Sequence, residues 1–297
     1  MASVPDGGSS PQPATAATEA RQAIAARSIF ASAVGTTITI LSQKGGTGKT
    51  TTVRTLADVF RRAGLEVLCV DLDPQGNLSD YFDVPADASP TISDVLAGQT
   101  KAADAVHDDI LPANLGLAEA ELILGGKMGR ELTLRRALRE LRRRYDLVLM
   151  DCPPSLGLLT VNALVAADHA LISTEAEYFS LQGVEQALEV IELAKESLHP
   201  DLEWLGVVLN IADMRLVHSR EALKQLQERF GDKVFPTVIR RSVRYAESAE
   251  RGVSIVDYAP DLGADYAALA HDVLGRLGGY EEARERLGAL RAELVPA

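Results

Sequence analysis

The chain of 297 residues lacks the marks of several protein classes. It has only two cysteines, Cys69 and Cys152, which excludes a disulfide scaffold and suits a reducing cytoplasm. No apolar run approaches the ~20 residues of a membrane-spanning helix, and the N-terminus lacks the early Lys or Arg of a secretory signal. Basic residues are outnumbered, 30 against 42 acidic ones, which argues against a surface that coats nucleic acid everywhere but leaves room for one basic face.

The remaining composition, with 46% hydrophobic residues, is that of a globular protein and excludes a mostly disordered one. Residues 1–34 are the exception, and we expect a flexible tail there because they are rich in Ala, Pro, Gly, Ser and Thr; its second part, residues 21–33, is at most a marginal helix. A core domain is expected over residues 35–278. A charged helical tail is expected over 279–297, with Leu287, Leu290 and Leu294 along one side.

Short apolar runs alternate with amphipathic segments in the core domain. This alternation predicts an α/β fold with a doubly wound, mostly parallel sheet that is covered by helices on both faces. Strands are expected at residues 37–41, 66–70, 147–150, 170–173, 205–209 and 234–239. Helices are expected at residues 49–62, 132–144, 156–166, 181–198 and 219–230.

The most informative segment is KGGTGKTT, residues 44–51, between the first expected strand and helix. Glycines there let backbone N–H groups approach an anion, and the helix N-terminus adds its positive dipole end. Lys49 is placed to reach the β- and γ-phosphates of a nucleotide, and the Thr50 hydroxyl to bind Mg²⁺. The strict G-x-x-x-x-G-K-T pattern is not met, since position 43 is Gln and an additional lysine, Lys44, precedes the glycine pair. The alternative is a glycine-rich turn with chance lysines, which the strand–loop–helix context disfavours.

Carboxylates end two of the expected strands. Asp71 and Asp73 follow the second strand, and Asp151 ends the run LVLMD at residues 147–151. In doubly wound sheets ligands bind at the carboxyl ends of the strands, where one carboxylate can orient an attacking water and others can hold the Mg²⁺ shell. Each Asp alone could also be an ordinary strand-ending residue. Their occurrence downstream of the phosphate loop favours a nucleotide site.

Two further segments offer contacts. Asn210 ends another strand and has the donors and acceptor that suit an adenine edge, although it could equally cap a turn. Residues 213–251 contain nine basic and six acidic residues, a net charge of +3 within a chain of net charge −12. That excess indicates either a phosphate-binding surface without sequence preference or a solvated helix face with salt bridges.

The segment from Lys44 to Thr50 resembles the deviant Walker A box of the ParA/MinD family of P-loop ATPases. The resemblance covers about residues 37–277 and is greatest to the chromosome- and plasmid-partition ParA proteins; segments around Asp73 and Asp151 are similar to the family's switch I and switch II. It implies that ATP and Mg²⁺ are the cofactors, that Lys44 acts on the nucleotide of a second subunit, and that Asp73 activates water. The implied nucleotide-binding residues are Lys44, Gly45, Gly46, Thr47, Gly48, Lys49, Thr50, Thr51 and Asn210, and the metal-binding residues are Thr50, Asp73 and Asp151.

The resemblance also implies non-specific binding of double-stranded DNA, because Arg241 and Arg244 align with two arginines of the family's DNA-binding segment. Arg240 stands where Pro is usual, and Arg215 belongs to the same basic region; we include both as candidate DNA contacts. Ser173 and Glu175 also depart from the family, which usually has Pro and Gln there.

The resulting hypothesis is a DNA-partition ATPase. Its ATP-bound homodimer binds DNA in the cytoplasm, on the nucleoid, and is released when a ParB-like centromere-binding or cargo adaptor protein stimulates an otherwise slow hydrolysis. An orphan ParA-like positioner of a non-DNA cargo is the alternative that sequence does not separate. A MinD-like membrane-surface ATPase is less favoured, because residues 281–293 hold four Glu and three Arg and a thin apolar stripe.

A redox relative with a shared metal cluster is not supported by the cysteines, which are expected in the core. The five histidines show no metal-ligand spacing.

Overall fold

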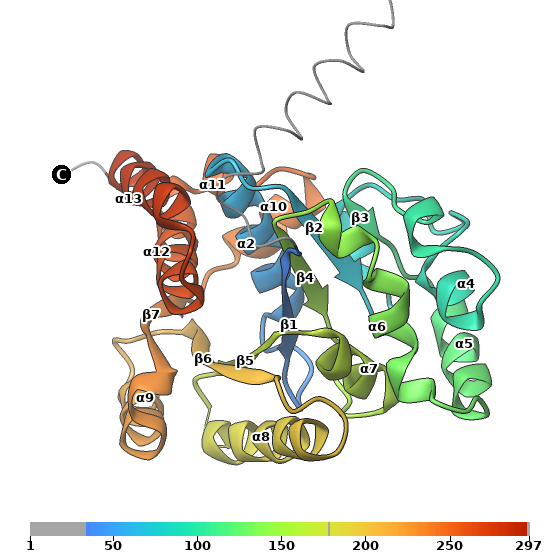
Figure 1. Cartoon of the computed structure of the whole chain (residues 1–297). Coiled ribbons are helices and arrows are strands. Elements are labelled where there is room, and N and C mark those ends of the chain that lie inside the picture. Colours follow the sequence, from blue (N-terminus) through green and yellow to red (C-terminus); the bar gives the residue numbers. More distant parts are fainter. Residues whose placement is uncertain (1–33, 178, 296–297) are drawn as a thin grey trace, which may run out of the picture. The chain divides into compact units, whose positions relative to one another are not determined.

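The computed structural model describes residues 34–177 and 179–295. The predicted flexible tail therefore lies almost wholly outside the described residues. A parallel sheet of seven strands, in the order β3-β2-β4-β1-β5-β6-β7, forms the centre of the fold (Figure 1). The strands are β1 (Thr36–Leu41), β2 (Val67–Asp71), β3 (Ile110–Leu111), β4 (Leu147–Asp151), β5 (His169–Glu175), β6 (Glu203–Ala212) and β7 (Val234–Arg240).

The central strands are buried on both sides, which is why their sequences read as continuous apolar runs. Every residue of β2 and β4 is buried. The six predicted strands are confirmed, with ends that differ by a few residues. Strand β3 was not predicted, because two residues, Ile110 and Leu111, are too few to give a periodic signal.

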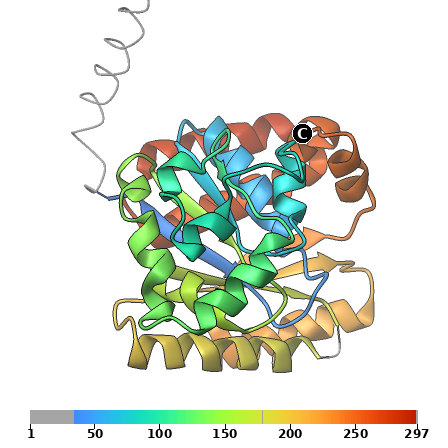
Figure 2. The ribbon, with the colours of Figure 1, turned by 90° about the vertical axis from the view of Figure 1, so that its right-hand side faces the viewer.

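Helices cover both faces of the sheet, as the alternation predicted. One apolar layer lies under the helices α4 (Ile92–Ala97), α5 (Gly116–Gly125), α6 (Thr133–Leu138), α7 (Leu158–Ala166), α8 (Ser180–Ser197) and α9 (Val217–Phe230). The opposite layer lies under α2 (Lys49–Arg62), α3 (Asn77–Tyr81), α10 (Arg244–Glu250), α11 (Ile255–Tyr258), α12 (Pro260–Leu277) and α13 (Glu281–Leu294). Figure 2 views the fold from the side of α4, α5 and α6.

The prediction of one helix over residues 132–144 is wrong. The segment is divided into a 3-10 turn at Arg130–Leu132, helix α6, and a second 3-10 turn at Leu141–Arg143. In the last turn Arg142 donates to the Gly35 carbonyl at 3.1 Å and to Asp168 Oδ2 at 2.6 Å. These tertiary contacts to the start of β1 and to the β5 edge outweigh the local helical preference.

The predicted C-terminal helix is present as α13, and it packs against α12. Leu287 is fully buried, and Leu290 and Leu294 are half-buried against the same apolar layer. The Tyr280 hydroxyl, just before α13, donates to Thr36 Oγ1 at 2.9 Å. The apolar side of α13 is thus part of the protein core. No helix among residues 34–177 and 179–295 has the length and apolar character to cross a membrane.

The substitution Leu287→Ala tests this packing. We expect it to lower the free energy of unfolding by about 2–4 kcal/mol, because it leaves a cavity at a fully buried position. Urea denaturation followed by circular dichroism measures the change. Leu193→Ala, at a side chain that is 63% exposed, is the control and should change stability by less than about 0.5 kcal/mol. Equal small changes in both variants would contradict the packing of α13.

Candidate nucleotide site

The phosphate loop connects β1 to α2 at the carboxyl edge of the sheet. Gly46 and Gly48 have φ angles of 78° and 79°, in the left-handed region that favours glycine. Gly48 is the N-cap of α2, and no side chain caps this helix. The first N–H groups of α2 are therefore available to an anion in the loop.

The Lys49 side chain points into this loop. It is buried, and its ammonium donates to Ser42 Oγ at 3.1 Å and to the Lys44 carbonyl at 3.2 Å. Burial lowers the pKa of Lys49, while the carboxylate of Asp151 opposes that shift. Both hydrogen bonds are to neutral oxygens, so a phosphate can replace them with a stronger charge-assisted contact.

Thr50 and Asp151 meet where Mg²⁺ is predicted. The Thr50 hydroxyl donates to Asp151 Oδ2 at 2.6 Å. The other carboxylate oxygen, Oδ1, is buried without a hydrogen-bond partner among the described residues. Burial, followed by repulsion from Asp71, raises the pKa of Asp151 well above its ordinary value. A buried carboxylate oxygen without a donor next to a threonine hydroxyl fits a hard cation.

The described residues contain no cluster of three His, Cys, Asp or Glu side chains that could hold a metal ion.

Asp71 and Asp73 have different environments. Asp71 is fully buried, accepts hydrogen bonds from the backbone and hydroxyl of Ser79 at 3.0 and 2.7 Å, and has its pKa raised to about 6 by burial. Its Oδ1 accepts the Asp73 backbone N–H at 3.0 Å. Asp73 is half-buried, and among the described residues its side chain accepts one hydrogen bond, from the Gln75 N–H to Oδ1 at 3.0 Å. Asp71 therefore holds the loop, whereas Oδ2 of Asp73 has no donor in the described part of the chain.

Asn210 lies against the phosphate loop. Its amide nitrogen donates to Ser173 Oγ at 2.7 Å and to Thr52 Oγ1 at 3.1 Å, and the side chain is buried. Ser173 in turn donates to the Thr47 carbonyl at 2.7 Å. The serine that replaces the family's usual proline thus joins Asn210 to the loop, a contact that the sequence alone did not indicate. Thr47 itself is buried against Ser42, with 2.8 Å between their hydroxyl oxygens.

The residue after Asn210 is strained. Ile211 has a φ of 54°, which is costly for a β-branched residue, about 1–3 kcal/mol. Sequence analysis gave no signal for it. Strain at the end of β6 fixes the direction in which the chain leaves the site.

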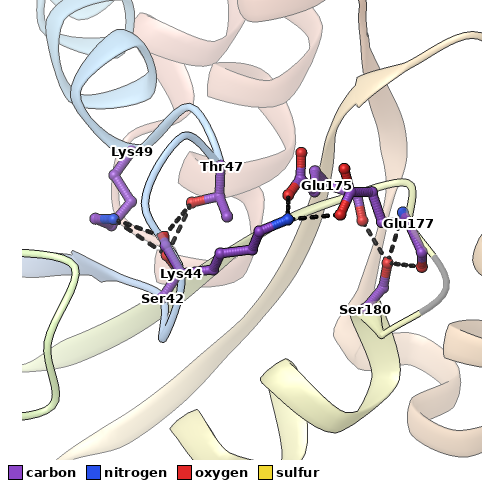
Figure 3. A network of polar contacts seen from close by, with 7 residues as sticks. All are labelled: Ser42, Lys44, Thr47, Lys49, Glu175, Glu177 and Ser180. Carbon is purple, nitrogen blue, oxygen red and sulfur yellow. Dashed lines mark hydrogen bonds and ion pairs between the residues drawn. The ribbon is translucent and has the colours of Figure 1, made fainter.

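Lys44 points away from the phosphate loop, toward the end of β5 (Figure 3). Its ammonium lies 2.5 Å from Glu175 Oε1 and 2.5 Å from Glu177 Oε2, and 61% of the side chain is exposed. Hydrogen bonds to these two carboxylates raise the pKa of Lys44 and lower that of Glu177. Glu175 occupies the position where the family usually has Gln, so this chain gives Lys44 a second anionic partner.

The remaining loop residues are placed as a phosphate loop requires. Gly45 faces Pro154 of the segment after β4, and a Cβ at Gly48 would lie 3.4 Å from Cγ of Asn210, so these glycines allow close approach. Thr51 is half-buried in the first turn of α2.

Both cysteines, Cys69 and Cys152, are buried and free, as expected of core residues.

Three of the four candidate DNA-binding arginines make ion pairs within the chain. Arg215 pairs with Asp213 at 2.7 Å, Arg240 with Asp265 at 2.8 Å, and Arg244 with Asp261 at 3.4 Å. The Arg241 side chain is exposed and makes no ion pair with the described residues.

Comparison with known proteins identifies the family. A family model described as an AAA domain matches residues 35–204. The chromosome partitioning protein ParA of Caulobacter vibrioides is 38% identical over 250 residues, which cover 80% of this chain and 94% of ParA. The chain belongs to the ParA/MinD family of P-loop ATPases. As a member of this family it is an ATPase with ATP and Mg²⁺ as cofactors.

Solved structures agree on the fold. The septum site-determining protein MinD of Pyrococcus horikoshii, complexed with Mg-ADP, has a TM-score of 0.67 at 28% identity and covers 80% of this chain and 96% of MinD. Cobyrinic acid a,c-diamide synthase of Mycobacterium smegmatis, with bound ADP and magnesium, has a TM-score of 0.67 at 36% identity and covers 73% of this chain and 93% of the synthase. The doubly wound P-loop fold predicted from the sequence is confirmed.

Asp151→Asn tests the metal-site assignment. We expect this variant without nucleotide to be more stable than the wild type at neutral pH by about 1–3 kcal/mol, since it replaces a buried carboxylate with a neutral amide at a position where Oδ1 has no donor among the described residues. Because the pKa of Asp151 is raised in the folded protein, the wild type loses stability relative to the variant as pH rises and the carboxyl ionises.

Thermal melting from pH 5 to 8, with and without Mg²⁺ and ATP, measures both effects. The variant should also lose most of the stabilisation that Mg²⁺ adds to ATP binding. Asp73→Asn, at a half-buried carboxylate, is the matched control for stability without nucleotide. A variant that is less stable at every pH would contradict the assignment.

Proposed function

We propose that the protein is an ATP-dependent DNA-partition ATPase that forms a nucleotide-sandwich homodimer. The observation that supports it most directly is the divergence of the two loop lysines: Lys49 is buried inside the loop, whereas Lys44 lies on the surface. A lysine that leaves its own phosphate loop is available to the nucleotide of a second subunit.

ATP would be held through its phosphates by the loop and by Lys49. Thr50, Asp151 and Asp73 would hold Mg²⁺, which offsets phosphate charge when bound. At the other end of the nucleotide, the amide nitrogen of Asn210 is already engaged by Ser173 and Thr52. Its carbonyl oxygen would therefore accept from the adenine amino group.

Hydrolysis would depend on two groups. Asp73, with its unused oxygen, would orient the attacking water, and Lys44 of the second subunit would neutralise charge that develops on the phosphoryl group. Lys44 must first exchange Glu175 and Glu177 for phosphate oxygens. That exchange fits a turnover that is slow without a partner.

The dimer would bind double-stranded DNA through Arg215, Arg240, Arg241 and Arg244, which would contact phosphates rather than base edges. Release would follow hydrolysis stimulated by a ParB-like centromere-binding or cargo adaptor protein. This activity would place the protein in the cytoplasm on the nucleoid.

An orphan positioner of a non-DNA cargo would use the same residues. The MinD-like alternative is disfavoured because the apolar side of α13 packs in the core and is not available to a membrane surface.

DNA co-sedimentation with ADP, ATP and a non-hydrolysable analogue, repeated at several salt concentrations, tests the proposal. We expect binding with ATP and the analogue only, and a loss of about 10-fold or more at low salt in Arg241→Ala/Arg244→Ala, with ATPase activity retained. Lys195→Ala/Lys224→Ala, which removes the same charge from α8 and α9, is the control. Equal binding in all nucleotide states would refute the coupling of ATP to DNA.

Dimerisation can be tested in a hydrolysis-deficient Asp73→Ala background, where we expect an ATP-dependent dimer by light scattering. Adding Lys44→Ala should remove the dimer, because the charge supplied across the interface is lost. Adding Glu175→Gln instead should let the dimer form at a lower protein concentration than the Asp73→Ala variant alone requires. The reason is that the change removes one of the two anions that hold Lys44. Persistence of the dimer in the Lys44→Ala variant would contradict the role of Lys44 between subunits.

A further inference from the structure

The strongest local excess of positive charge lies outside the region selected by sequence. Residues 130–144 contain seven arginines and two glutamates, a net charge of +5 within a chain of net charge −12. This segment includes α6 and its two flanking 3-10 turns, on the side of the fold seen in Figure 2. It lies at the opposite side of Figure 1 from β7 and α9.

Six of the seven arginines are exposed, among them Arg136, Arg139 and Arg143. Arg136 lies in α6, Arg139 directly follows that helix, and Arg143 lies in the second 3-10 turn. Lys101 lies across a cleft of about 360 Å³ that Arg136 and Arg139 also line. We call Lys101, Arg136, Arg139 and Arg143 the α6 basic surface.

None of the four side chains makes an ion pair or hydrogen bond with the residues that the structure describes. The one carboxylate that lines the cleft, Glu140, pairs with Arg144 at 2.6 Å. This differs from the β7–α10 region, where Arg240 and Arg244 are paired with aspartates. Within the described residues, the α6 basic surface therefore has charge that no ion pair compensates.

The chemistry of the lining favours phosphate groups over a polypeptide. Besides Lys101, Arg136, Arg139 and Glu140, the cleft is lined by Thr100, three alanines and Val95, which is 5% exposed. Peptide-binding sites usually offer large aliphatic or aromatic anchors. Arginine and lysine in a row without such anchors are typical of contacts to a nucleic-acid backbone.

We propose that the α6 basic surface is a second contact surface for the phosphate backbone of double-stranded DNA, separate from the Arg240–Arg244 segment. The inference rests on the proposed DNA binding and adds a surface to it. Arg136 lies in α6, Arg139 is the C-cap of that helix, Arg143 lies in the 3-10 turn that follows, and Lys101 precedes the turn at Ala102. None of the four comes from the nucleotide loop.

The test is the triple variant Arg136→Ala/Arg139→Ala/Arg143→Ala of the full chain. Fluorescence anisotropy with a labelled random-sequence duplex measures affinity against salt concentration in the presence of the non-hydrolysable analogue. We expect an affinity loss of about 10-fold or more at low salt and a salt slope reduced by about 2–3, the value for three lost phosphate contacts. Lys195→Ala/Arg286→Ala/Arg291→Ala removes the same charge from α8 and α13, outside residues 213–251, and should change the slope little.

Titration with a fluorescent ATP analogue and a thermal melt must show the triple variant folded and nucleotide-competent. If triple and control variants lose equal affinity while the wild type binds DNA, this inference fails and the proposed function stands. If the wild type binds no DNA in any state, both fail. If labelled polyglutamate binds the wild type more tightly than the duplex does, and the triple variant loses that binding, the surface recognises acidic protein and the inference is overturned.

Discussion

The site depends on two carboxylates buried side by side at the ends of neighbouring strands. Asp71 and Asp151 are register partners of β2 and β4. Each is held below the surface by the apolar runs that form the sheet. Burial raises the pKa of both, and repulsion from Asp71 adds to the rise for Asp151. The buried Lys49, the Ser79 donors and the Thr50 hydroxyl offset that cost. A site that carries this much unsatisfied negative charge is prepared for a cation.

Contacts within the chain fix Asp71 and Asp151, whereas Lys44 has two alternative sets of partners. Lys44 has two anions beside it in its own chain, and its proposed partner is a triphosphate in another chain. In the proposed dimer, the balance between these two partners would depend on protein and nucleotide concentration. Glu175, where the family usually has Gln, would move that balance toward the monomer.

Sequence predicted the fold well, because the apolar runs and the loops between them are local signals, and it selected the loop glycines and strand-ending aspartates that lie together at one edge of the sheet. It did not predict the connection from Asn210 through Ser173 to Thr47, since these hydroxyl and amide contacts join three separate strand ends. The helix break before Leu141 was missed for the same reason: distant partners of Arg142 determine it. The net charge of residues 213–251 also did not show that Arg215, Arg240 and Arg244 are paired with aspartates.

The Ser79 hydroxyl works as a relay between two parts of the fold. It donates to Asp71 Oδ2 at 2.7 Å and accepts the Ala113 N–H, just after β3, at 2.9 Å. Asp71 in turn fixes the backbone of Asp73. Displacement of the short edge strand would take the Ala113 N–H away from its acceptor and disturb the hydroxyl that holds Asp71. The outer margin of the sheet and the loop that carries Asp73 are thus connected through one hydroxyl group.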